Sequence, residues 1–198
     1  MIKRLGMGVV ALAVGVAGAA WWQSKGDAGH AGAPVASARP SGGEFTLQTA
    51  NGPISLRDLR GNVVLLYFGY THCPDVCPAT MAAGAQALAR LEPEERAKTR
   101  LLFVSLDPER DTPAKLKEYA AFFHAEMIGA TGTPDQVASM ARAYGAGFIR
   151  QPPAPDGSYA VDHSTQTYVI DPDGKLVGNI EYGASADKVV TVLREWLS

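Results

Sequence analysis

The two cysteines are the residues of this sequence with the clearest chemistry. Cys73 and Cys77 are the only cysteines among 198 residues, and each is followed by a proline. Such a pair can form a structural disulfide, act as a redox couple or bind a metal ion. Because a chain of this length can bury a core without a disulfide, the purely structural role is the least favoured of the three.

Both thiols are expected at the start of a helix. The apolar run Val63 to Phe68 precedes them, as a buried strand would, and Pro78 fits the first turn of the helix that follows. The positive end of the helix dipole and its free N–H groups lower the pKa of a thiol. A lowered thiol pKa would favour redox attack and metal binding alike.

The spacing of the two cysteines distinguishes a redox couple from a metal site better than their position at the start of a helix does. A four-residue step along a helix separates two Cα atoms by about 6 Å, which is within reach of a disulfide and also lets two thiolates point at one ion. Thioredoxin-type oxidoreductases usually carry C-x-x-C, whereas this chain carries C-x-x-x-C. The wider loop points away from simple dithiol exchange.

A metal site needs more donors than two sulfurs, and the sequence offers four histidines. His163 is the favoured candidate because it precedes the predicted strand Thr167 to Ile170, in a loop expected to face the cysteine turn of a thioredoxin-like sheet. The side chain of His72 is expected to point away from that of the cysteine after it. His30 lies in a predicted linker and His124 at the end of a predicted helix, so both are expected to be surface residues.

Two thiolates and one imidazole, from Cys73, Cys77 and His163, would form a Cys₂His set. Sulfur ligands favour copper(I), and an imidazole also accommodates copper(II). Structural zinc would need a fourth protein ligand. Asp75 and Asp162 are candidates for orienting the ligands from outside, although a turn residue and a loop cap are equally good interpretations of them.

The elements that must position these residues predict an α/β fold with a central mixed sheet flanked by helices. They follow one another as an N-terminal β-hairpin, a strand, a helix, a strand, two helices, a β-arm, two strands and a helix. Early βαβ units followed by an antiparallel strand pair are typical of a thioredoxin-like fold. The expected strands cover residues 45–48, 54–56, 63–68, 100–106, 148–149, 159–161, 167–170 and 176–182, and the expected helices cover about 79–91, 112–123, 133–144 and 185–197.

The N-terminal segment predicts export. Lys3 and Arg4 precede the apolar run Leu5 to Trp22, which is just long enough for a membrane-spanning helix. The small residues Ala17-Gly18-Ala19 also fit a cleaved signal peptide. Residues 1–24 are therefore expected to be a membrane anchor or a signal segment, and either places the domain in an oxidising compartment.

The rest of the chain divides into a linker and one domain. Residues 25–43 are rich in Gly, Ala, Ser and Pro, as a flexible linker would be, and residues 44–198 are expected to form the thioredoxin-like domain. The formal net charge is −2 and neither sign forms a long run. This charge pattern argues against a nucleic-acid partner.

Three stretches resemble the motifs of the Sco/SenC family. They are GYTHCPDVCP at 69–78, VSLDPERDTP at 104–113 and DHSTQTYVIDPDGK at 162–175. The resemblance implies a thioredoxin-like fold, a membrane tether and, in bacteria, a periplasmic domain held at the inner membrane or released after signal cleavage. Carried over by motif, Cys73, Cys77 and His163 are the implied copper ligands, whereas His72 is not a ligand in the family.

The same resemblance implies a function in the assembly of cytochrome c oxidase. The protein would be a metallochaperone that delivers copper to the CuA-bearing subunit, rather than a conventional enzyme. Another periplasmic copper chaperone or a thiol reductase is a further candidate partner. For Asp107 and Arg110, in the second motif, a salt-linked loop near the site is the working hypothesis.

Two other functions stay open. A thiol–disulfide oxidoreductase that keeps CuA-site cysteines reduced would use one cysteine to attack and the other to resolve, and it would not need His163. A peroxidase on the same fold is disfavoured, because the residues before Cys73 do not match the sequence that precedes a peroxidatic cysteine.

Overall fold

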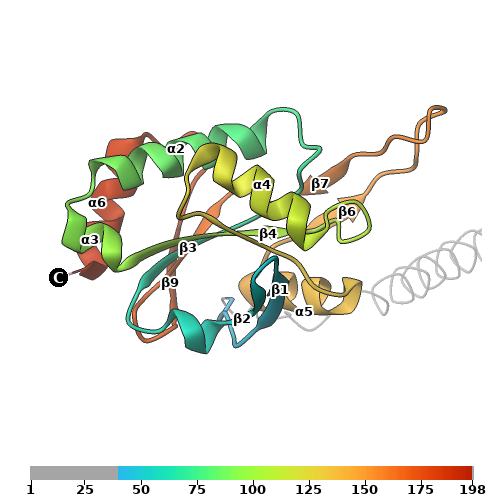
Figure 1. The fold of residues 1–198 in the computed structure, drawn as a ribbon. Helices are drawn as coiled ribbons and strands as arrows, with labels where there is room; N and C mark the ends of the chain where they lie inside the picture. The colour runs from blue at the N-terminus through green and yellow to red at the C-terminus, as the bar shows by residue number, and fades with distance from the viewer. Residues whose placement is uncertain (1–39, 198) are drawn as a thin grey trace, which may run out of the picture. The chain divides into compact units, whose positions relative to one another are not determined.

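The computed structural model describes residues 40–197, with a five-stranded sheet at their centre (Figure 1). Its strands are β3 Val63–Gly69, β4 Thr99–Ser105, β5 Ile128–Ala130, β8 Thr167–Ile170 and β9 Leu176–Ile180. The order across the sheet is β5-β4-β3-β8-β9. β3, β4 and β5 are parallel, whereas β8 runs antiparallel to β3, and β9 antiparallel to β8. The predicted mixed sheet of a thioredoxin-like fold is confirmed.

Helices cover both faces of this sheet. They are α2 Val76–Arg90, α3 Pro93–Ala97, α4 Pro113–Phe123, α5 Pro134–Tyr144 and α6 Ala186–Leu197. In Figure 1, α2, α4 and α6 lie on one side of the sheet and α5 lies on the other. α4 and α5 begin as predicted: the hydroxyls of Thr112 and Thr133 accept from backbone N–H groups of the first turn, and a proline follows each threonine.

Alternate side chains of β3 point to opposite faces of the sheet and pack into a separate core on each face. Tyr67 points to the side of α2 and α4, where its ring stacks on Phe103, which in turn contacts Tyr119 of α4. The next residue, Phe68, packs against Tyr144 of α5 on the other side. Every residue of β3 is buried, as expected for a central strand covered on both faces.

Two hairpins form two-stranded sheets of their own beside the central sheet. The first, predicted from sequence, pairs β1 Thr46–Thr49 with β2 Gly52–Ser55 and is followed by the 3₁₀ helix η1 Leu56–Leu59. The second pairs β6 Phe148–Arg150 with β7 Val161–His163. Residues 148–163, named here the β6–β7 hairpin, project from the domain in Figure 1. This hairpin is the predicted β-arm, and it ends on the candidate ligand His163.

The sequence prediction missed three short elements: η1, which begins at Leu56, a residue expected in a strand, and also β5 and α3. β5 and α3 contain only three and five residues, too few to show a periodic pattern. β5 also contains Gly129, where the sheet passes so close to α4 that an added Cβ would lie 2.7 Å from the carbonyl carbon of Leu116. α2 begins at Val76, three residues earlier than predicted, so that its first turn includes Cys77.

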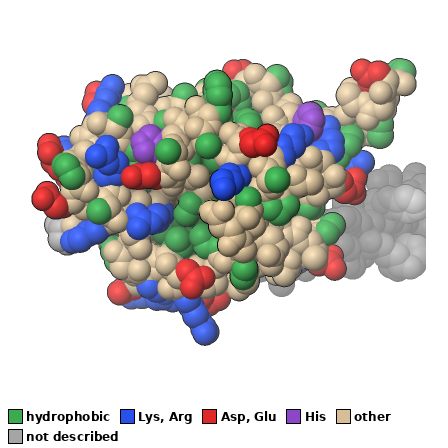
Figure 2. Space-filling model, in the orientation of Figure 1, with side chains coloured by type: hydrophobic (Ala, Val, Ile, Leu, Met, Phe, Trp, Pro, Cys, Tyr) green, Lys and Arg blue, Asp and Glu red, His purple; other side chains and the backbone are tan. Residues whose placement is uncertain are grey.

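The predicted membrane segment and nearly all of the predicted linker lie outside the described residues. Within residues 40–197, no helix is both long enough and apolar enough to cross a membrane. On the face of the domain seen in Figure 2, basic and acidic side chains are interspersed among neutral and apolar ones.

Candidate metal centre

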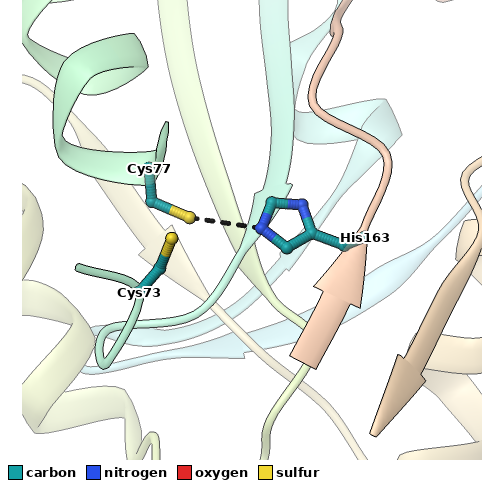
Figure 3. A group of neighbouring side chains, drawn as sticks. All are labelled: Cys73, Cys77 and His163. Carbon is teal, nitrogen blue, oxygen red and sulfur yellow. Dashed lines mark hydrogen bonds between the residues drawn. The ribbon is translucent and has the colours of Figure 1, made fainter. Parts of the chain in front are cut away.

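Cys73, Cys77 and His163 converge beside the carboxyl end of β3 (Figure 3). The two Sγ atoms and an imidazole nitrogen all lie within 4.8 Å of one another. The Sγ of Cys77 is 3.5 Å from Nε2 of His163. Among residues 40–197, this is the only group of three or more His, Cys, Asp or Glu side chains placed to share one metal ion.

The turn after β3 fixes the two cysteines. The Cys73 N–H donates to the Tyr70 carbonyl at 3.2 Å, which closes the chain directly after the strand. Cys77 lies in the first turn of α2 and is fully buried, whereas Cys73 is 9% exposed. Gly69 at the end of β3 leaves room for Cys77, since a Cβ there would lie 2.7 Å from its Sγ. Cys73 is therefore the more accessible thiol of the pair.

The backbone holds His163 in one tautomer. Its Nδ1 lies 2.8 Å from the carbonyl oxygen of Ser164, which can only accept, so Nδ1 carries the proton. The unprotonated Nε2 then faces Cys77 as a metal donor. The rings of Tyr67 and Tyr70 meet the imidazole edge to face, with centroids 6.1 and 5.9 Å away. These two contacts fix the plane of the imidazole.

Burial favours the neutral form of both donors. It raises the pKa of the Cys77 thiol to about 12 and lowers the pKa of the His163 imidazole below its usual value. The prediction that the helix N-terminus lowers the thiol pKa is wrong for Cys77, because the loss of hydration outweighs the helix dipole. A metal cation would supply the charge that makes a thiolate favourable at this position.

The two aspartates that were candidates either for orienting the ligands or for local turn and cap roles lie close to the ligands in the sequence. Asp75 is the N-cap residue of α2, but its side chain makes no capping hydrogen bond. Asp162 points to the face of β7 opposite to His163 and accepts a hydrogen bond from Gln151 at 2.6 Å. Within the described part of the chain, the carbonyl of Ser164 is the group that orients the imidazole through a hydrogen bond.

The other described histidines lie outside the metal-ligand group, in agreement with the sequence analysis. The side chain of His72 is 45% exposed, and its ring nitrogens lie near Thr71 and Lys115. His124 is the C-cap residue of α4, where its Nδ1 accepts from the N–H of Glu126. His30 is outside the described residues.

Sequence reasoning did not identify the two tyrosines around the site. Tyr67 and Tyr70 stand in the same short stretch as the cysteines, but only the position of the β6–β7 hairpin brings His163 against them. The hypothesis of a salt-linked loop is confirmed, because Arg110 forms an ion pair with Asp107.

The donor set fits a soft metal ion. Two sulfurs and one imidazole nitrogen suit copper(I) and also accommodate copper(II). The group contains no fourth Cys, His, Asp or Glu among residues 40–197, which structural zinc would normally require.

The sequence also matches known proteins. A family model described as SCO1/SenC matches residues 34–198. The mitochondrial protein SCO2 of Saccharomyces cerevisiae is 42% identical over 138 residues, which are 69% of this chain and 46% of that protein. The chain spans about half the length of several mitochondrial relatives that it matches.

Solved structures extend this similarity to the fold. ScoI of Bradyrhizobium japonicum with copper bound superposes with a TM-score of 0.72 at 33% identity, over 78% of this chain and 98% of that one. BsSco, a member of the Sco family of cytochrome c oxidase assembly proteins in which a disulfide switch was identified, superposes with a TM-score of 0.65 at 25% identity, over 81% and 95% of the two chains. Since the family match covers the whole of the described domain, this chain belongs to the SCO1/SenC family.

Proposed function

We propose that this protein binds one copper ion through Cys73, Cys77 and His163. The observation that carries the proposal is the convergence of two sulfurs and an imidazole nitrogen within 4.8 Å. Thiolates suit copper(I), and the neutral Nε2 extends the set to copper(II). The structure of Bradyrhizobium japonicum ScoI with copper bound supports the choice of metal.

The proposed role is delivery of copper to the CuA-bearing subunit of cytochrome c oxidase. The metal would pass by ligand exchange: an acceptor thiolate binds it from the side of Cys73, which is 9% exposed, and the buried Cys77 releases it last. Another periplasmic copper chaperone would supply the ion, or a thiol reductase would keep the pair reduced. The description of BsSco as a member of a family of cytochrome c oxidase assembly proteins supports this role.

The test is the His163→Ala variant, with His124→Ala as the matched control. His163→Ala is expected to weaken copper(II) binding by more than about 100-fold, because it removes a ligand rather than a group that orients one. His124→Ala is expected to bind like the wild type. Copper affinity is measured by competition with a chelator on reduced protein. An unchanged copper(II) affinity in His163→Ala would overturn the assignment of the ligands.

Thiol–disulfide exchange is a second candidate function. It is favoured by the proximity of two free cysteines and by the disulfide switch identified in BsSco. The Cys73 thiolate would attack a disulfide of an acceptor, and Cys77 would then displace the acceptor from the mixed disulfide. Two electrons pass to the acceptor, which leaves as a dithiol, while Cys73 and Cys77 become a disulfide.

The reductase candidate is tested with the same His163→Ala variant on a CuA-domain disulfide. Exchange chemistry needs only the two sulfurs, so an unchanged reduction rate would support this function. A rate that falls in parallel with copper affinity would count against it.

The proposed location is the bacterial inner membrane, with residues 44–198 in the periplasm. The basic residues Lys3 and Arg4 followed by the apolar run Leu5 to Trp22 support an N-terminal anchor. Cell fractionation with N-terminal sequencing separates this anchor from a signal peptide cleaved after Ala19, which would leave the protein in the periplasmic fraction.

A further inference from the structure

The loop between β4 and α4 contains two buried carboxylates that are not among the proposed ligands. The N–H groups of Arg110 and Asp111 both donate to the carbonyl of Asp107, at 3.2 and 3.0 Å, so the loop closes on itself. Asp107 is 4% exposed and Asp111 is fully buried. Because a buried carboxylate is costly unless it is well partnered, the partners of these two residues show what the loop holds in place.

Asp111 binds the cysteine loop. Its carboxylate accepts from the Thr71 N–H at 2.9 Å and from the Thr71 hydroxyl at 2.5 Å. It also accepts from Ser105 at the end of β4, at 2.6 Å, and lies 3.6 Å from Nζ of Lys115 in α4. Thr71 precedes Cys73 by two residues, so Asp111 ties the turn that carries Cys73 to the strand and the helix behind it.

Asp107 and Arg110 bind the β6–β7 hairpin. The hydroxyl of Tyr159 donates to Asp107 at 2.8 Å, and Nη1 of Arg110 donates to the Tyr159 carbonyl at 3.0 Å. The guanidinium groups of Arg110 and Arg150 lie 3.4 and 3.9 Å from the centroid of the Tyr159 ring. Tyr159 precedes His163 by four residues, so these contacts hold the strand that carries the imidazole.

The two sets of contacts meet at the site. The guanidinium of Arg110 lies 5.8 Å from the centroid of the Tyr70 ring, and that ring meets the imidazole of His163 edge to face. Tyr70 directly precedes Thr71, the residue that Asp111 binds. One loop thus bonds to both segments of the chain that carry the proposed ligands.

We infer that residues 107–111 form a clamp with two arms. One arm holds the turn that carries Cys73, the other holds the strand β7 that carries His163, and together they set the distance between these two segments. Asp111 positions Cys73 through Thr71, and Asp107 and Arg110 position His163 through Tyr159. The inference rests on the proposed ligand set, but it concerns contacts that exist without metal, so it is tested first on the metal-free, reduced full-length chain.

The Thr71→Val variant tests the cysteine arm. Loss of the partly buried hydroxyl bond to Asp111 is expected to lower the hydrogen-exchange protection of the Cys73 amide by about tenfold. It is expected to lower the equilibrium constant for forming the Cys73–Cys77 disulfide against glutathione by a similar factor, because Cys73 is held less firmly near its partner. The matched control is Thr99→Val, which removes a hydroxyl bond to the Glu95 carbonyl at the other end of β4 and should change neither quantity.

The Tyr159→Leu variant tests the histidine arm. Protection of the paired amides of β6 and β7 is expected to fall by about tenfold, while the disulfide equilibrium constant stays at the wild-type value. Copper(II) binding is expected to weaken by about the same factor, because the imidazole is no longer held in place. The control is Tyr182→Leu, which removes a tyrosine ring that is 46% exposed and outside the clamp.

The effects of all the variants, compared segment by segment, test whether residues 107–111 act as a clamp. The clamp is supported if each variant changes only its own segment. It is overturned if Thr71→Val behaves like Thr99→Val, if Tyr159→Leu leaves β6 and β7 as protected as before, or if each variant weakens both segments equally. If the wild-type protein fails to bind copper, the proposed function is overturned instead. The clamp is then still tested, because hydrogen-exchange protection and disulfide formation are measured without metal.

Discussion

At the scale of single residues, burial favours the neutral forms of the metal donors Cys77 and His163, and the hydroxyl of Tyr67 beside them stays protonated. Burial keeps the pKa of the Tyr67 phenol far above its usual value, so its O–H is a permanent donor. Its oxygen lies 3.9 Å from the Sγ of Cys77, where it lowers the cost of a thiolate that burial disfavours. A metal-bound Cys77 thiolate therefore has the Tyr67 hydroxyl as a hydrogen-bond donor, in addition to the backbone N–H of Tyr70, which also lowers the pKa of this thiol.

Replacing Tyr67 by phenylalanine is expected to weaken copper(I) binding at neutral pH by about three- to tenfold, the effect of one hydrogen bond to a charged group. Affinity is measured by competition with a chelator. The matched variant is Tyr144→Phe, which removes a buried hydroxyl bonded to the Gly43 carbonyl at 3.0 Å, away from the site. Equal copper affinities in the two variants would show that the Tyr67 hydroxyl does not act on Cys77.

Copper affinity is expected to rise with pH between 7 and 9, by about tenfold per pH unit for each thiol proton that the metal displaces. The pKa of Cys77 is raised to about 12, so its thiol is protonated throughout this range. The pKa of His163 is lowered, so the imidazole is already neutral there and adds nothing to the slope. The same slope is therefore expected in His163→Ala, at lower affinity. An affinity that stays constant between pH 7 and 8 would contradict binding through a protonated thiol.

At the scale of elements, the site depends on three segments being held against one another. β3 delivers the cysteine turn, α2 begins at Val76 with Cys77 in its first turn, and β7 presents His163 from a hairpin outside the central sheet. The hairpin pairs only with itself in the described part of the chain, so side-chain contacts must hold it in position. In the main sheet, β5 lies directly against α4.

Gly129→Ala is expected to destabilise the fold by about 1–3 kcal/mol, because the added Cβ would lie 2.7 Å from the Leu116 carbonyl carbon in α4, which cannot move as a side chain can. The free energy of unfolding is measured with urea. Gly178→Ala in β9 is the control, since nothing lies within 4 Å of a Cβ there and stability should be unchanged or slightly higher. A Gly129→Ala variant as stable as Gly178→Ala would show that β5 and α4 are packed less closely.

At the scale of the whole molecule, the buried thiol of Cys77 and buried tyrosine phenols make the folded protein less stable at high pH. Burial raises the pKa of Cys77 from 9.0 to about 12 and that of Tyr144 from 10.0 to about 12. A group with a higher pKa in the folded protein binds its proton more tightly when folded. Its stabilising contribution is therefore complete below the unfolded pKa and is lost as pH rises toward the folded value.

The free energy of unfolding of the metal-free protein is accordingly expected to fall between pH 9 and 12, by about 1.4 kcal/mol per pH unit for each such group. Urea unfolding at several pH values measures this slope. Tyr144→Phe should flatten it above pH 10, whereas Tyr182→Phe, at a half-exposed position, should leave it unchanged. Stability independent of pH up to 11 would contradict the raised pKa values.

Much of the local structure follows from patterns that lie within a few residues of one another. The buried run of β3, the threonine–proline starts of α4 and α5, and the thioredoxin-like order of elements were all predicted correctly. Short-range rules suffice there because hydrophobic periodicity and helix capping act between near neighbours. β5 and α3 were not predicted, because elements of three and five residues are too short to show a hydrophobic period.

The sequence by itself thus determined the fold class and identified Cys73, Cys77 and His163 as the candidate ligands. Only the tertiary structure decided how those residues behave. The raised thiol pKa of Cys77 depends on how deeply α2 is buried, and the orientation of His163 depends on contacts with β3 from a hairpin some ninety residues further along the chain. Burial and long-range contacts are set by the packing of whole elements, which spacing along the chain does not encode. For the same reason the sequence indicated only a salt-linked loop near the site at Asp107 and Arg110, and not that residues 107–111 contact both segments that carry the proposed ligands.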